Sequence, residues 1–101
     1  MSADVRFRGT FRYDDEDALA EAVADAGAFI EDDEELQDLL DEEGCIDVGK
    51  NRVTIDINLG VPWDWVQVLQ DMIEAFAEHA SSGEVSCRID DEEMDPYEAE
   101  S

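Results

Sequence analysis

Polar and apolar positions alternate with a period of two along the start of the chain. From Val5 to Tyr13 the odd positions are apolar or small, and the even positions hold three arginines and a threonine. This alternation is typical of a strand that is buried on one face. The same pattern recurs in residues 46–48, 53–59 and 85–89. Because Gly49, Lys50 and Asn51 favour a turn, the middle two runs predict a hairpin.

Two longer segments have helical spacing instead. Leu19, Val23, Ala26 and Ile30 form an apolar stripe, which follows an acidic run that suits a helix N-terminus. A wider stripe follows Pro62 and predicts a second main helix. Its members are Trp65, Val66, Leu69, Met72, Ile73, Phe76 and Ala80.

A short apolar stripe between these two helices predicts a third. It consists of Leu36, Leu39 and Leu40, and Gly44 follows as a terminating residue. One unbroken helix from Asp15 to Glu43 would be about 43 Å long, which exceeds any sheet that this chain could form. We therefore expect a break between residues 27 and 33.

The resulting order, β-α-(α)-β-β-α-β, predicts an α+β fold of the ferredoxin-like type. Such a split βαβ sandwich has a four-stranded antiparallel sheet with its helices on one face. We expect residues 1–90 to form a single domain. Residues 91–101 are acidic with few apolar side chains, and we expect a disordered tail there.

Thirty acidic residues against six basic ones give the chain a formal net charge of −24. A charge of this sign favours cationic partners and opposes direct binding to nucleic acid or to anionic membranes. The N-terminus has no signal-peptide pattern, and no apolar run reaches the length of about 20 residues that a membrane span needs. We therefore expect a soluble, cytoplasmic protein. The sequence does not predict its oligomeric state.

The most acidic segment is the predicted short helix. Residues 31–43 hold nine carboxylates and no basic residue. Trp63 lies off the apolar stripe of its helix, and tryptophan is enriched at the centres of protein interfaces; the alternative is packing against the preceding loop. The candidate partner-binding residues are therefore Asp32, Asp33, Glu34, Glu35, Asp38, Asp41, Glu42, Glu43 and Trp63.

Strand parity places all the arginines on the sheet face that the helices leave open. This predicted basic patch consists of Arg6, Arg8, Arg12, Arg52 and Arg88. The arginines could pair with nearby acids across strands, be covered by the acidic tail, or bind a partner. The outward positions lack aromatic residues that could stack on bases, so a nucleic-acid platform is not expected.

Catalytic and metal-binding patterns are weak throughout. The acidic segments lack the glycine that an EF-hand calcium loop needs at its sixth position. The sequence has no glycine-rich phosphate-binding loop, and His79 is its only histidine. Cys45 and Cys87 fall on the predicted second and fourth strands, at opposite sheet edges, so we expect both thiols to be free. We expect no enzyme activity, no metal site and no cofactor.

Two hypotheses for function remain. The first is a small binding protein that masks a basic surface, as an inhibitor, an immunity protein or a mimic of nucleic-acid charge. The second is a soluble domain from a halophile, in which the acidity is an adaptation to salt and leaves the function open. Five arginines against one lysine favour the second hypothesis, while the uneven distribution of acids favours the first.

Overall fold

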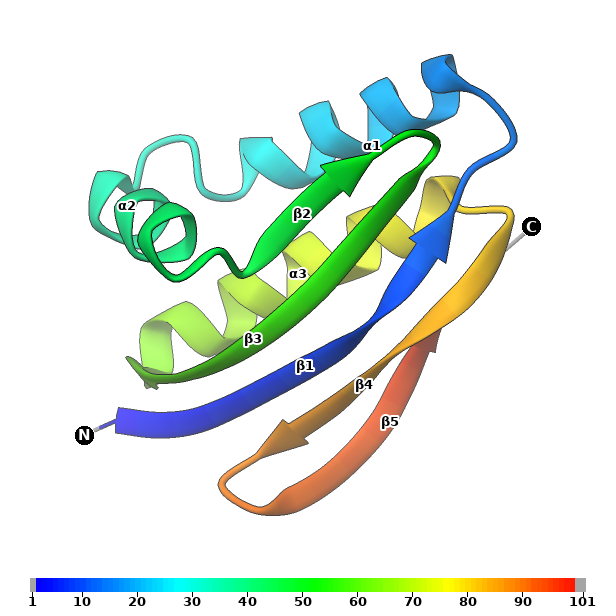
Figure 1. The fold of residues 1–101 in the computed structure, drawn as a ribbon. Coiled ribbons are helices and arrows are strands. Elements are labelled where there is room, and N and C mark those ends of the chain that lie inside the picture. The colour runs from blue at the N-terminus through cyan, green and yellow to red at the C-terminus, as the bar shows by residue number, and fades with distance from the viewer. Residues whose placement is uncertain (1, 100–101) are drawn as a thin grey trace.

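The computed structural model describes residues 2–99 of the chain. Within these residues, five strands and three helices follow one another along the chain (Figure 1). The elements are β1 Ser2–Arg12, α1 Glu16–Ala28, α2 Glu34–Glu43, β2 Ile46–Gly49, β3 Arg52–Pro62, α3 Trp63–His79, β4 Ser82–Ile89 and β5 Glu92–Glu98.

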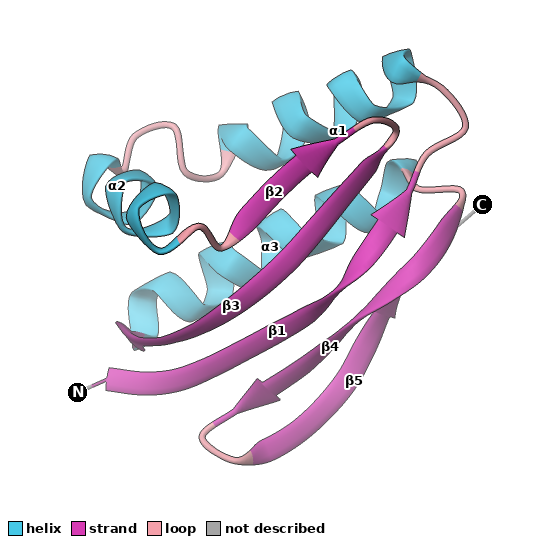
Figure 2. Cartoon of the chain, viewed as in Figure 1, coloured by secondary structure: helices cyan, strands magenta, loops and turns pink. Residues whose placement is uncertain are grey.

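The strands form one antiparallel sheet in the order β2-β3-β1-β4-β5. α1 and α3 lie on one face of the sheet, and the other face is open (Figure 2). In β1, Ala3, Val5, Phe7 and Phe11 are buried on the helix side, while the arginines between them are exposed. The α+β class and the predicted alternation of the first strand are confirmed.

The sheet has five strands, so the predicted number of four is wrong. Residues 92–98, which were predicted to belong to a disordered tail, form β5 and pair with β4. The chain reverses at Asp90 and Asp91, whose φ angles of 52° and 66° lie in the left-handed region that aspartate tolerates better than most residues. Tyr97 then packs against the core, with its ring centroid 6.4 Å from that of Phe7.

β5 was missed because its sequence carries little of a strand signal. Four of its seven residues are carboxylates and one is Pro96, and only Tyr97 is partly buried. Residues 100 and 101, the end of the predicted tail, lie outside the described residues. That residues 1–90 form a domain by themselves stays a prediction.

α3 provides most of the helical contribution to the core. Its buried side chains include five large ones that the apolar stripe predicted: Val66, Leu69, Met72, Ile73 and Phe76. The buried hydroxyl of Tyr13 donates a hydrogen bond of 2.8 Å to the carbonyl oxygen of Phe76. Burial raises the pKa of Tyr13, so the hydroxyl keeps its proton and remains a donor. This bond fixes the end of β1 to α3.

α1 is rich in alanine and buries a narrower face than its stripe predicted. Asp15 caps the helix by accepting a hydrogen bond of 2.8 Å from the backbone N–H of Ala18. Leu19, Ala22 and Ala26 are buried, but Val23, another member of the apolar stripe, is 38% exposed. The helix ends at Ala28, and α2 begins at Glu34, as the expected break requires.

Both cysteines are free and buried. Cys45 lies directly before β2, an edge strand, and Cys87 lies in β4. Because β5 covers β4, the predicted place of Cys87 at a sheet edge is wrong. The two residues are nevertheless on different sides of the central strands β3 and β1.

No helix within residues 2–99 combines the length and the apolar content that crossing a membrane requires.

The placement of β5 can be tested through Tyr97. We expect Tyr97→Ala to lower the free energy of unfolding by about 1–3 kcal/mol, because a half-buried ring and its contact with Phe7 are lost. Tyr97→Phe keeps the ring and should change this free energy by less than about 0.5 kcal/mol. Urea melts of both variants and of the exposed control Asp95→Ala measure the difference. A Tyr97→Ala protein as stable as the control would contradict the packing of β5.

Candidate functional site

α2 is held to the rest of the molecule by its two ends and by one apolar side. The carboxylate of Asp33 accepts a hydrogen bond of 3.2 Å from the backbone N–H of Leu36, and Gly44 ends the helix with a φ of 63°. Leu36 and Leu40 are buried. Since this side of α2 faces the core, its acidic side chains are directed to solvent.

The side-chain amide of Gln37 also fixes the segment before α2. It donates hydrogen bonds to the carbonyl oxygens of Ile30 and Glu31, the second at 3.1 Å. These bonds hold the loop between α1 and α2 against α2. The loop and α2 therefore present their carboxylates together at one end of the molecule.

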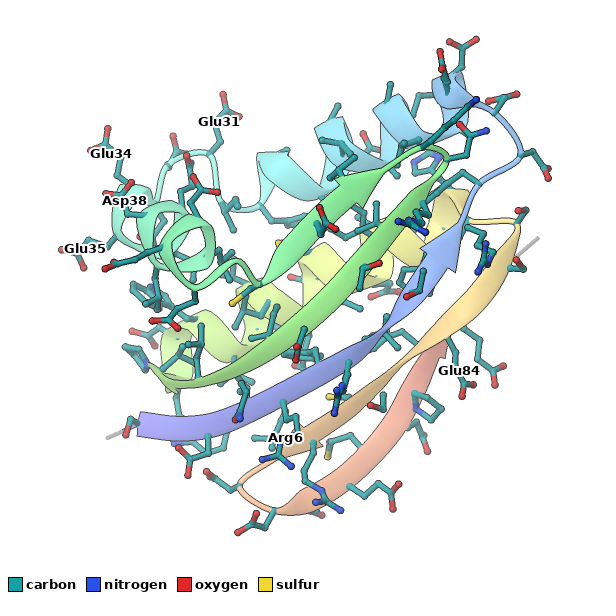
Figure 3. The ribbon with its side chains drawn as sticks, in the orientation of Figure 1. Arg6, Glu31, Glu34, Glu35, Asp38 and Glu84 are labelled. Atoms are coloured by element: carbon teal, nitrogen blue, oxygen red, sulfur yellow. The ribbon has the colours of Figure 1, made fainter. Side chains whose placement is uncertain are left out.

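The name α2 surface is used here for eight predicted partner-binding carboxylates that the structure brings together: Asp32, Asp33, Glu34, Glu35, Asp38, Asp41, Glu42 and Glu43. All are exposed except Asp33, the helix cap, which is partly buried. Figure 3 shows Glu34 and Glu35, together with Glu31 of the preceding loop, extending away from the molecule. Their charges are therefore available to a partner.

The α2 surface has no basic partner within residues 2–99. The salt bridges found there both involve His79, whose ring contacts Asp25 at 2.6 Å and Glu21 at 3.8 Å, and these acids belong to α1. Like charges at helical spacing repel by roughly 0.2–0.5 kcal/mol per pair. The α2 surface thus stores repulsion that a cationic ligand would relieve.

The carboxylates do not converge on a common point. In the described part of the chain, no group of three or more His, Cys, Asp or Glu side chains is arranged to hold a metal ion. The α2 surface is therefore an array of separate charges.

Trp63, the remaining predicted partner-binding residue, is 48% exposed at the start of α3. The start of α3 and α2 lie at the same end of the molecule (Figure 1). Trp65, by contrast, is partly buried against the core. A role for Trp63 in an interface stays a prediction.

The five arginines of the predicted basic patch are exposed, and the strand register places them on the open sheet face. Cross-strand register places Arg6 beside Arg88 and Arg12 beside Arg52. No arginine within residues 2–99 has a carboxylate oxygen within 4.0 Å. Six carboxylates occupy the same face: Asp4, Asp47, Asp56, Glu84, Glu93 and Glu98. The open face is therefore mixed in charge, in contrast to the wholly acidic α2 surface.

The two cysteines are buried and Tyr97 is partly buried, and burial favours the neutral form of each side chain. Burial raises the pKa of Cys45, with smaller contributions from Glu43 and Asp56, and burial also raises the pKa of Cys87. Burial, with nearby Cys87, Glu74 and Asp71, raises the pKa of Tyr97 to about 12. Because a thiol must ionise to act as a nucleophile, neither cysteine is activated.

Sequence reasoning missed a groove between α1 and β2. Val23 and Val48, exposed by 38% and 50%, lie on its two sides. The available signal was the alanine content of residues 18–28, because a helix of small side chains leaves space beside a neighbouring strand.

Comparison with protein-family models, with curated proteins and with solved structures found no match to this chain.

The state of the thiols can be measured directly. Without reductant, the unfolded protein should contain two reactive thiols, since both are free. In the folded protein at pH 8, we expect alkylation to be roughly tenfold slower or more, because burial blocks access and the raised pKa lowers the thiolate fraction. Mass spectrometry of iodoacetamide-treated samples follows both states. Rapid labelling of either cysteine in the folded protein would contradict its burial.

Proposed function

We propose that this protein is a small, non-enzymatic binding protein whose α2 surface engages a basic protein partner. The observation that carries the proposal is the array of exposed carboxylates on α2, to which the described residues offer no basic side chain. A cationic partner would relieve the repulsion within the array. Long-range attraction would also raise the association rate, by about 10- to 1,000-fold at low salt.

Such a protein would act by covering a basic surface. Inhibitors, immunity proteins and mimics of nucleic-acid charge all work in this way, and the net charge of −24 disfavours direct binding to nucleic acid. Trp63 would add an apolar contact at the same end of the molecule. We place this activity in the cytoplasm, with no cofactor.

The scaffold proposed for this role is ferredoxin-like. The order β2-β3-β1-β4, with α1 and α3 on one face, supports that assignment. β5 and α2 would then be additions to the basic unit, one at a sheet edge and the other before β2. Since this fold serves many functions, the proposal depends on the α2 surface and not on the scaffold.

Adaptation to high salt is the second candidate explanation for the acidity. The wide distribution of the acids favours this explanation. Exposed carboxylates also occur on the open sheet face, and four of the seven residues of β5 are acidic. Under this explanation the charges serve solubility and hydration, and no particular surface is selected for a partner.

The role of the α2 surface can be tested by neutralising four of its charges. The variant carries Glu34→Gln, Glu35→Gln, Asp38→Asn and Glu42→Gln, and it leaves the cap residue Asp33 in place. We expect unchanged or slightly higher stability, because like-charge repulsion is reduced. Association with the basic partner, isolated from native lysate at low salt, should slow by roughly tenfold and depend less on salt.

The matched control neutralises the four carboxylates of β5 through Glu92→Gln, Glu93→Gln, Asp95→Asn and Glu98→Gln. This variant also loses four negative charges, but it loses them from the β5 edge of the sheet instead of from α2. It should affect association less than the α2 variant does. Equal slowing by both variants would mean that only the total charge matters, and unchanged rates in both would reject the α2 surface.

Thermal melts over a range of salt concentrations separate the two explanations. We expect the melting temperature to rise from low salt to about 0.5 M, because screening weakens repulsion among the carboxylates. A binding protein should already be folded at low salt, whereas a protein that needs molar salt to fold supports salt adaptation. A melting temperature that falls with salt would show that local pairing compensates the acids.

A further inference from the structure

β2 is an edge strand with unpaired backbone groups. The backbone N–H of Asp56 donates a hydrogen bond of 2.8 Å to the carbonyl oxygen of Cys45, so these residues form a hydrogen-bonded pair. In an antiparallel ladder such pairs alternate with pairs whose backbone groups point outward. Ile46 and Val48 therefore direct their N–H and C=O groups away from β3, toward the free edge.

The two edges of the sheet differ in how far they are protected. β5 carries Glu92, Glu93, Asp95 and Glu98 as well as Pro96, and charged residues and proline both discourage a further strand from pairing. β2 contains no proline and one carboxylate, Asp47. The edge at β2 is therefore the one that can accept an additional strand.

A groove lies beside this edge. One hollow of about 590 Å³ is lined mainly by apolar residues of α1, α2, β2 and α3, among them Val23, Leu40, Val48, Met72 and Phe76. A second hollow of about 500 Å³ continues it toward the β2–β3 turn, and the two share Val23, Ala24 and Val48. The groove remains open because the alanines of α1 are too small to fill it.

The rim of the groove is acidic. Glu31 and Asp41 line the first hollow, Glu16 lines the second, and Lys50 is the one basic residue among the residues that line them. A second copy of this chain is a poor occupant, since each copy carries a formal charge of −24. A segment that combines apolar side chains with lysine or arginine matches both the floor and the rim.

We propose that this groove binds an extended, cationic segment of the partner protein, which pairs with the outer edge of β2. The free backbone groups select an extended chain, because a helix satisfies its own groups internally. Alternate side chains of the added strand would enter the groove over Val23 and Val48, and the basic side chains between them would lie on the open sheet face, beside Asp47 of β2. The inference rests on the proposed function in that it names the part of the basic partner that is recognised.

A synthetic peptide provides the test. The probe is a blocked eight-residue peptide in which lysine and valine alternate, and the control peptide has serine in place of each valine. We expect the lysine–valine peptide to bind at least about tenfold more tightly at 0.15 M salt, since only it can fill the apolar groove. Equal affinities would overturn the proposal, because charge alone would then explain the binding.

A matched pair of protein variants tests the pairing with β2. Val48→Pro removes an N–H that points to the free edge and leaves the hydrogen bonds to β3 intact. We expect it to weaken binding of the lysine–valine peptide at least about tenfold, while Val48→Thr, which keeps the N–H and the shape, should weaken it only about threefold or less. Unchanged affinity in a folded Val48→Pro protein would overturn the proposal.

Hydrogen exchange of the wild-type protein gives a readout that needs no variant. On binding the lysine–valine peptide, the amides of Ile46 and Val48 should exchange at least about tenfold more slowly, while those of β5 should not change. Protection at β5, or at neither edge, would overturn the proposal even if Val48→Pro failed to fold.

The variant with four neutral residues on the α2 surface separates this inference from the proposed function. Its substitutions lie outside the groove lining. Loss of peptide binding in Val48→Pro, with little change in the α2 variant, supports the groove even if the α2 surface is rejected. Loss in the α2 variant with full binding by Val48→Pro overturns the groove and leaves the proposed function standing.

Discussion

The packing of α3 against one face of the sheet is the interaction on which the rest of the molecule depends. The core within residues 2–99 contains no buried charged side chain, and most of its largest members come from α3 and the central strands β1 and β3. Burying apolar surface contributes roughly 25 cal/mol per Å², so the buried face of α3 stabilises the fold. The carboxylates of residues 2–99 all lie at or near the surface, where repulsion between them opposes folding.

This arrangement explains why the fold tolerates the high density of carboxylates on α2. α2 is attached by Leu36, Leu40, its Asp33 cap and the bonds from Gln37, so its charges extend from the end of the molecule without disturbing the sheet. α1 is different, because His79 of α3 contacts two of its acids and thereby fastens one helix to the other. His79 therefore contacts acids of the helix that packs on α3, whereas no ion pair within residues 2–99 involves the carboxylates of α2.

The sequence predicts those features that depend on periodicity. The alternation around Phe7 and the stripe from Val66 to Phe76 identify the buried faces because one side of each element must meet the core. Periodicity fails where burial is slight. β5 has only Tyr97 against the core, so its pairing with β4 depends on backbone bonds that leave no pattern in the side chains.

The sequence likewise predicts one part of the candidate site, the α2 surface, and does not predict the groove. The exposed carboxylates of α2 follow from the position of its leucines, so the α2 surface could be predicted from the sequence alone. The groove could not, because it results from how far alanine-rich α1 stands from a strand of only four residues. Val48 has the parity of a buried residue and is nevertheless 50% exposed, which only the three-dimensional arrangement reveals.

β5 follows the other elements within residues 2–99, and this order affects how they emerge during synthesis. The other elements within residues 2–99 leave the ribosome before β5 does. Until β5 pairs with it, β4 is an edge strand whose outer backbone groups, including those beside Val85 and Cys87, are unpaired. Unpaired edge strands of this kind promote association between nascent chains. Most of the carboxylates of this sequence precede β5, and mutual repulsion between neighbouring copies would keep them apart until β5 pairs with β4.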